Sequence, residues 1–201
     1  ITSISSIAAP VGGEVTLKGT SLNNVQSVTV GEIEASVVSS TDTELTITVP
    51  SGLDENLEAP ITVVTTGGEA SAPGKFYVGN NLLLNGGFEL GDGDEFANWS
   101  KFNGGDLMTA TTEDGEAFFG RSLRAVGAGG DAWRTQLASD AAPTQADVEY
   151  TLTMWIKGQP GTPGDGGNIR FSTTPDALYS ANYDITAEWQ QIEWVFTANA
   201  S

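Results

Sequence analysis

The side chains with the clearest chemical potential in this sequence are aromatic rings placed among glycines and polar residues. Trp133 follows a glycine pair, where a core tryptophan would be unusual, and Gln136 lies three residues later. Tyr179 and Tyr183 lie in a second polar stretch. A flat ring offers an apolar surface to the C–H face of a sugar, while fixed polar groups bond to its hydroxyls. Trp133 is therefore a candidate contact for a sugar. The alternative for Trp133 is a place in the core or in an interface.

Two arginines near these rings add hydrogen-bond donors. Arg134 follows Trp133 directly, and Arg170 lies in the alternating stretch 168–172, on the face opposite its apolar residues. An outward guanidinium can donate to sugar hydroxyls. On a surface this acidic, the alternative is an ordinary salt bridge to a nearby carboxylate.

Charge and missing residue types exclude several classes of protein. The chain has 26 acidic and 8 basic residues and a formal net charge of −18, so it is unsuited to nucleic acid or to an anionic membrane surface. It contains no cysteine and no histidine. That excludes disulfides, thiolate metal sites, most zinc sites and the Ser-His-Asp arrangement. No apolar run is long enough to insert into a membrane.

Paired carboxylates are the remaining route to catalysis. Asp114 and Glu116 imitate the two carboxylates of a glycosidase, but they occupy a turn rather than opposite sides of a cleft. The acidic run 91–95 lacks the glycine and distal glutamate of an EF-hand, so a solvated loop is the better interpretation. We therefore expect no enzymatic activity.

Residues 1–79 consist of short alternating stretches separated by turn residues. Several of these read as strands, namely 15–19, 27–30, 33–38, 45–49 and 61–66. We expect 27–30 and 33–38 to form a hairpin that turns at residues 31–32. Phe76 and Tyr77 are the only aromatic residues of this segment, which favours a spacer over a ligand binder.

The order of these stretches resembles the TIG/IPT family of immunoglobulin-like domains. The matching residues are 4–7, 12–20, 28–31, 47–50, 63–68 and Phe76. The resemblance covers nearly all of residues 1–78. It implies a small immunoglobulin-like sandwich that serves bacterial surface proteins as a spacer or an interaction module.

Strand patterns continue in residues 80–201 with larger side chains. The stretch 148–157 carries apolar residues on one face and places Trp155 on its polar face. The stretch 191–197 turns Trp194 inward, so we expect this tryptophan in the core. Residues 158–167 read as a long exposed loop, because strand patterning resumes directly after them.

Several motifs of this half resemble a family 4/9/22-type carbohydrate-binding module. They are the sequence Asn-Gly-Gly-Phe-Glu at 85–89 after three leucines, Trp99, and the stretches 120–126, 150–157 and 186–190. The resemblance implies a β-jelly-roll whose concave sheet binds a glycan chain, usually a β-glucan or xylan. Members of this family continue with further strand and a closing aspartate, so we expect the protein to extend beyond Ser201.

The same resemblance implies roles for individual aromatic residues. It places a stacking tryptophan at Trp133 and its polar partner at Gln136. It places a second platform in the loop that contains Tyr179, where Tyr183 is a nearly equal candidate.

It also implies a structural Ca²⁺ site. The ligands here would be the carboxylate of Glu89, the carbonyl of Gly87, a carbonyl near Lys101 and a carboxylate of the turn 113–116, represented by Glu116.

Together these interpretations predict an all-β protein with an immunoglobulin-like sandwich at 1–79 and a larger β-jelly-roll, truncated at its C-terminus, at 80–201. The predicted function is non-catalytic binding of extracellular polysaccharide, either a β-glucan such as laminarin or mixed-linkage glucan, or xylan. We expect an exported bacterial protein at the cell surface, with further domains or a surface glycan-uptake complex as partners. The alternative is a structural or adhesive subunit that buries Trp133 and Tyr179 in subunit contacts.

Overall fold

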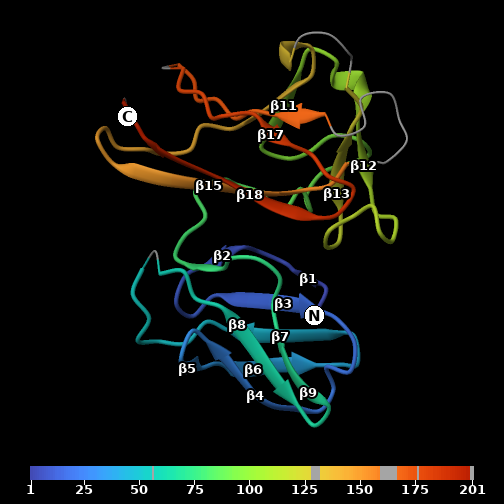
Figure 1. Cartoon of the computed structure of the whole chain (residues 1–201), viewed down its shortest axis with the longest axis vertical. Coiled ribbons are helices and arrows are strands. Elements are labelled where there is room, and N and C mark those ends of the chain that lie inside the picture. The colour runs from blue at the N-terminus through green and yellow to red at the C-terminus, as the bar shows by residue number, and fades with distance from the viewer. Residues whose placement is uncertain (56, 128–131, 159–166, 176, 200–201) are drawn as a thin grey trace. The chain divides into compact units, whose positions relative to one another are not determined.

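The computed structural model describes residues 1–55, 57–127, 132–158, 167–175 and 177–199 (Figure 1). Within these residues the chain forms β-strands and short 3-10 helices, so the predicted all-β class is confirmed. No helix in the described ranges is long and apolar enough to cross a membrane. The chain divides into two compact units. The first unit comprises 1–89 and 111–122, and the second comprises 90–110 and 123–201.

Two four-stranded sheets form the first unit. One has the order β1-β3-β7-β6, with bounds Ser3–Ile4, Glu14–Lys18, Glu44–Thr48 and Ser36–Ser40. The other has the order β5-β4-β8-β9, with bounds Ile33–Glu34, Val25–Val30, Ile61–Thr65 and Gly68–Ser71. A parallel pair, β2 (Ala8–Ala9) and β10 (Tyr77–Val78), brings the start and the end of this segment side by side.

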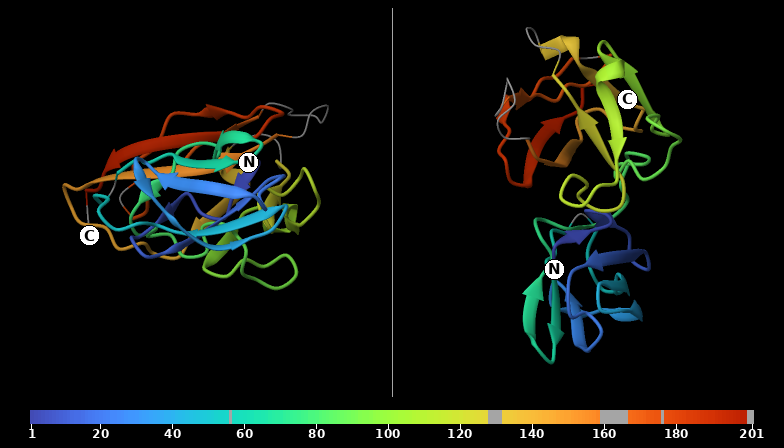
Figure 2. Two further views of the ribbon diagram at one scale, coloured as in Figure 1. Left: turned by 90° about the horizontal axis from the view of Figure 1, so that it is seen from below. Right: turned by 90° about the vertical axis from the view of Figure 1, so that its right-hand side faces the viewer.

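Aliphatic residues from both sheets meet in one core. Because side chains alternate along a strand, every second residue of β3, β4, β7 and β8 points inward. The fully buried cross-strand pairs are Val15–Ile47 and Leu17–Leu45 in one sheet, and Val28–Val63 and Val30–Ile61 in the other. Burial of each such side chain contributes about 1.5–3 kcal/mol to folding. Figure 2 shows the strands of this unit in blue to teal.

The stretch 33–38 differs from the single strand that was predicted. Its first part, β5, pairs with β4 through Val30 and Ile33, as expected for the hairpin. Its second part belongs to β6, which pairs with β7 in the other sheet. Ala35 lies between the two parts and is buried. The chain therefore changes sheets at a small residue, which suits a place where the backbone itself approaches the core.

A segment distant in sequence completes the first unit. Residues 111–122 connect β12 (Met108–Thr111) to β13 (Ser122–Ala125). Phe118 packs against the aliphatic core, and its backbone N–H donates to Ser122 Oγ at 3.0 Å. The Lys18 ammonium lies 4.4 Å from the centroid of the Phe119 ring. Both aromatic residues of this segment thus contribute to the first unit.

The other strands form two-stranded sheets. β11 (Trp99–Phe102) pairs with β14 (Gln136–Ser139), β12 with β13, β15 (Glu149–Ile156) with β18 (Gln190–Thr197), and β16 (Asn168–Ile169) with β17 (Tyr183–Asp184). The antiparallel pair β15–β18 is drawn in orange and red in Figure 1. Two 3-10 helices, η1 (Gly105–Leu107) and η2 (Ala132–Arg134), precede β12 and β14.

Aromatic rings pack together in the second unit. Trp194 and Phe196 of β18 stack with centroids 4.4 Å apart. The Phe171 ring lies 6.3 Å from Trp194 and 5.7 Å from Tyr183. Trp194 therefore packs inward, as its position in the alternating stretch predicted. Trp155, expected on the outward face of its strand, is half-buried.

We predict that Phe118→Ala destabilises the first unit by about 2 kcal/mol, below the range for a fully buried phenylalanine because Phe118 is only half-buried. All five tryptophans lie in the second unit. Urea unfolding followed by far-ultraviolet circular dichroism reports both units, whereas tryptophan fluorescence reports the second. The loss of stability should appear in the circular dichroism transition and not in the fluorescence transition. Glu113→Gln, an exposed change in the same segment, is the control. An unchanged dichroism transition in Phe118→Ala would contradict the packing role.

Candidate functional site

Exposed aromatic rings mark the most unusual surfaces of the chain. All five tryptophans, four tyrosines and eight phenylalanines lie in the described residues, and one of each type is exposed. These are Trp133 at 57%, Tyr179 at 59% and Phe102 at 53%. The other aromatic residues are buried or half-buried. Since large rings normally bury most of their surface, exposure of these three singles out the elements that carry them.

Two of the three rings lie at the same end of the β11–β14 pair. The burial of β11 alternates, which turns Ser100 and Phe102 outward. Phe102 lies directly opposite Gln136 in the register, so their side chains share one face. Helix η2 immediately precedes Gln136 and carries Trp133. The register of one strand pair therefore places Phe102 beside the residues that sequence reasoning had selected.

The amide of Asn103 fixes this end of the pair. Its Nδ2 donates to the carbonyl oxygen of Trp133 at 3.1 Å and to Oε1 of Gln136 at 3.0 Å. The next residue, Gly104, has φ 61°, and a Cβ there would lie 2.7 Å from the carbonyl oxygen of Arg134. Only glycine allows the turn to approach η2 so closely. The loop that carries Trp133 is therefore held by the turn after β11.

We define the β11–β14 surface as Phe102, Trp133, Arg134 and Gln136, with Asn103 as its support. The Arg134 guanidinium carbon lies 5.8 Å from the centroid of the Trp133 ring. Gln136 Oε1 accepts from Asn103, which leaves its Nε2 available to donate outward. Sequence reasoning identified three of these residues. It missed Phe102 and Asn103, although the alternating pattern of residues 99–102 before an Asn-Gly-Gly turn was a usable signal.

The third exposed ring, that of Tyr179, lies beside a second guanidinium. Phe171 and Ser180 exchange hydrogen bonds, and Ser172 bridges to Tyr179, so the chain doubles back between these positions. Phe171 and Ser180 are buried, whereas Tyr179 points outward. The guanidinium carbon of Arg170 lies 4.6 Å from the Tyr179 centroid. Within the described residues, no hydrogen bond or ring contact joins this pair to the β11–β14 surface.

Tyr183 has a different environment from Tyr179. It is half-buried, its ring packs near Phe171, and its hydroxyl donates to the carbonyl oxygen of Glu193 at 2.6 Å. Ring and hydroxyl are therefore both used in packing the second unit. Of the two tyrosine candidates, Tyr179 is the exposed one.

The candidate calcium ligands have protein partners of their own. Glu89 accepts backbone N–H groups with both carboxylate oxygens, from Gly120 at 3.1 Å and Arg121 at 2.9 Å. Glu116 accepts from the Thr111 hydroxyl at 3.3 Å. Glu89, Glu116 and Gly87 belong to the first unit, and Lys101 belongs to the second. No group of three or more acidic side chains in the described residues could hold a metal ion. The calcium site therefore stays a prediction.

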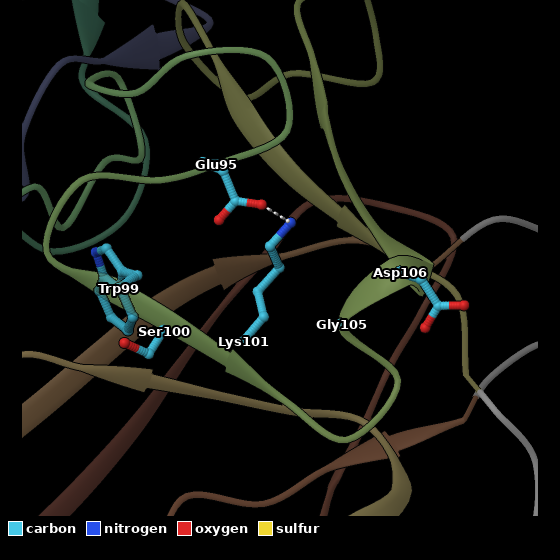
Figure 3. Close-up of a pocket in the computed structure, with 6 residues that line it drawn as sticks. All are labelled: Glu95, Trp99, Ser100, Lys101, Gly105 and Asp106. Carbon is cyan, nitrogen blue, oxygen red and sulfur yellow. Dashed lines mark ion pairs between the residues drawn. The ribbon is translucent and has the colours of Figure 1, made fainter.

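Lys101 fills an oxygen-lined position with its own ammonium. Its Nζ lies 2.9 Å from Glu95 Oε1, 2.9 Å from the carbonyl oxygen of Asp94 and 3.3 Å from that of Met108. The side chain is only 12% exposed. Figure 3 shows the Glu95–Lys101 ion pair in a depression also lined by Trp99, Ser100, Gly105 and Asp106. Three acceptors match the three ammonium protons, so Lys101 locks the acidic loop 91–95.

Comparison with known proteins identifies the first part of the chain. Residues 1–78 match the IPT/TIG domain family, which confirms the resemblance seen in the sequence. A comparison with curated proteins finds no match.

Solved structures also align with the chain. One is SGBP-B from a complex xyloglucan utilization locus in Bacteroides uniformis, at 19% identity and a TM-score of 0.35. The alignment covers 96% of this chain and 58% of that chain, so this chain spans well under two thirds of its length. Another is a crystal structure of domains CD (residues 230-489), at 18% identity and a TM-score of 0.36, covering 96% of this chain and 80% of that one.

We predict that Lys101→Met destabilises the second unit by about 2 kcal/mol, because it removes charge-assisted hydrogen bonds from a mostly buried ammonium. Urea unfolding followed by tryptophan fluorescence measures the change. Lys75→Met is the matched control, since Lys75 forms an exposed ion pair with Glu58 at 3.3 Å. Equal effects of the two substitutions would show that Lys101 does not lock the loop.

Glu89→Ala tests whether this carboxylate is a clamp or a metal ligand. As a clamp for two backbone N–H groups, it should contribute about 1–2 kcal/mol to the first unit, equally with a chelator or with millimolar calcium. Thermal unfolding followed by circular dichroism in both conditions gives the answer. A rise in the wild-type midpoint on adding calcium, absent from Glu89→Ala, would establish the calcium site and overturn the clamp as the main role.

Proposed function

We propose that the second unit binds polysaccharide without catalysis, and that the β11–β14 surface makes the central contact. One observation carries this proposal: Trp133 is the exposed member of five tryptophans, and its loop is fixed by Asn103. Leaving an indole in water forgoes the free energy of its burial. Holding it there by a side-chain hydrogen bond lowers the entropy lost when a ligand arrives.

The chemistry of this surface fits a sugar chain. The rings of Trp133 and Phe102 offer apolar area to the C–H faces of pyranose residues. The Arg134 guanidinium and the Gln136 amide offer donors to ring substituents. These four side chains lie at or beside a strand end rather than in an enclosed cavity. Such a position suits a polysaccharide chain that runs past the site. A β-glucan, such as laminarin or mixed-linkage glucan, or xylan is the expected ligand class.

A non-catalytic role agrees with the positions of Asp114 and Glu116, the acidic pair that imitates the carboxylates of a glycosidase. Asp114 bridges to Ala117, and Glu116 accepts from Thr111, so both residues are part of one turn in the first unit. An acid and a base for glycoside hydrolysis would instead flank a bound sugar. The first unit presents no exposed aromatic ring, which favours a spacer role in an exported surface protein.

The competing proposal is a structural or adhesive surface subunit. In that case another subunit covers Trp133 and Tyr179 in the assembly, and the two rings are exposed only in the isolated chain. The two proposals differ in the partner that should bind the same rings, and both can be tested on one purified protein.

Isothermal titration with laminarin, mixed-linkage β-glucan and xylan tests the proposal. We expect saturable heat with one of them, and Trp133→Ala should weaken that binding about thirtyfold, the equivalent of ~2 kcal/mol for a central aromatic contact. Phe102→Ala should weaken it less. Val38→Ala is the control, because Val38 is similarly exposed but lies in the first unit. No heat with any glycan, together with concentration-dependent assembly in light scattering, would support the structural subunit instead.

A further inference from the structure

Cations are scarce in this chain, and at least half of them form ion pairs or side-chain hydrogen bonds within the protein. There are 8 basic residues for 26 acidic ones. Lys18, Lys75 and Lys101 form ion pairs with Glu44, Glu58 and Glu95. The guanidinium of Arg121 donates to the carbonyl oxygen of Phe88 at 2.8 Å. With three carboxylates for each cation, an accessible cation on this surface readily finds an acidic neighbour.

Arg134 and Arg170 are distinguished by their aromatic neighbours. Within the described residues neither forms an ion pair with a carboxylate, although both are exposed. Each lies instead near the ring of an exposed aromatic residue, Arg134 at 5.8 Å from Trp133 and Arg170 at 4.6 Å from Tyr179. The same arrangement, an outward ring beside a guanidinium that pairs with no carboxylate of the described residues, therefore occurs twice.

The charged groups beside these rings are donors only. A guanidinium has N–H donors and no acceptor. The Gln136 amide oxygen already accepts a hydrogen bond from Asn103, which leaves its NH₂ group available to donate. A sugar hydroxyl both donates and accepts, and it uses such a surface only in part. A carboxylate accepts only, and a planar guanidinium binds it with two parallel hydrogen bonds.

We propose that the polysaccharide recognised by these two ring–guanidinium pairs carries carboxylates, in the form of hexuronate residues along or beside its chain. This inference rests on the proposed function and specifies its ligand. The rings contact the sugar faces, and Arg134 and Arg170 bind the carboxylates.

The overall charge restricts the number of carboxylates that the ligand can carry. With a net charge of −18, the protein repels any polyanion, and at physiological ionic strength this repulsion is screened beyond about 8 Å. Contacts at the two guanidinium groups can therefore favour isolated carboxylates. Each further carboxylate meets only the acidic surface. The ligand is thus a sparsely substituted glycan, such as a xylan with occasional glucuronate branches, rather than a polyuronate.

Matched pairs of glycans test this proposal by isothermal titration. One pair is glucuronoxylan and the same polymer after reduction of its carboxyl groups to alcohols. The other is a β-1,3-glucan and the same glucan lightly oxidised to uronate at C6. The proteins are the wild type, Arg134→Gln, Arg170→Gln and the double variant. Lys75→Gln, which removes one positive charge from the first unit, is the control for net charge.

In the glycan pair that binds, the affinity of the wild type for the carboxylated member should exceed its affinity for the neutral member by about tenfold or more, as expected for charge-assisted hydrogen bonds. The double variant should lose this preference, so that it binds both members of the pair with equal affinity, and Lys75→Gln should retain the preference. Equal affinity of the wild type for the two members of a pair, or a preference that survives in the double variant, would overturn this inference and leave the proposed function standing. Absence of binding to both pairs would overturn the two together.

Discussion

The hydrogen bonds donated by one side-chain amide hold the candidate site together. Asn103 Nδ2 bonds to the backbone of η2 and to the side chain of Gln136, so it fixes both the loop of Trp133 and the direction of the Gln136 amide. Asn103 and Gly104 both adopt positive φ, at 38° and 61°, a backbone conformation that these two residue types tolerate best. The site therefore depends on the turn that follows β11.

Local sequence patterns predicted the features that depend on residues close together in the sequence. Alternation in β3, β4, β7 and β8 identified the inward residues of the first unit, and it turned Trp194 inward in the second. The glycine-rich approach to Trp133 correctly signalled exposure, because a ring without neighbouring bulk cannot be buried locally. Local patterns could not show which of two tyrosines, only four residues apart, is the exposed one. Packing against Phe171 and a hydrogen bond to Glu193 distinguish Tyr183 from Tyr179.

Other features depend on contacts between distant residues, which local patterns specify only in part. Phe102 joins the site only through its register with Gln136, and register depends on the whole strand pair. The break at Ala35 depends on which sheet offers the next strand a partner. The acidic loop 91–95 resembles a cation site in composition, yet a lysine from β11 supplies the positive charge there. The composition of this loop shows its carboxylates but does not show that the Lys101 ammonium contacts it.

The chain passes between the two compact units three times, after residues 89, 110 and 122. Proteins built from independent modules exchange them in evolution as uninterrupted stretches of coding sequence. Here a stretch that encodes only residues 1–79 would arrive in a new gene without Phe118 and Phe119, which pack in the first unit. The two halves of this chain are therefore expected to be inherited as a pair, and recombination points should fall outside residues 1–122 rather than between the apparent domains.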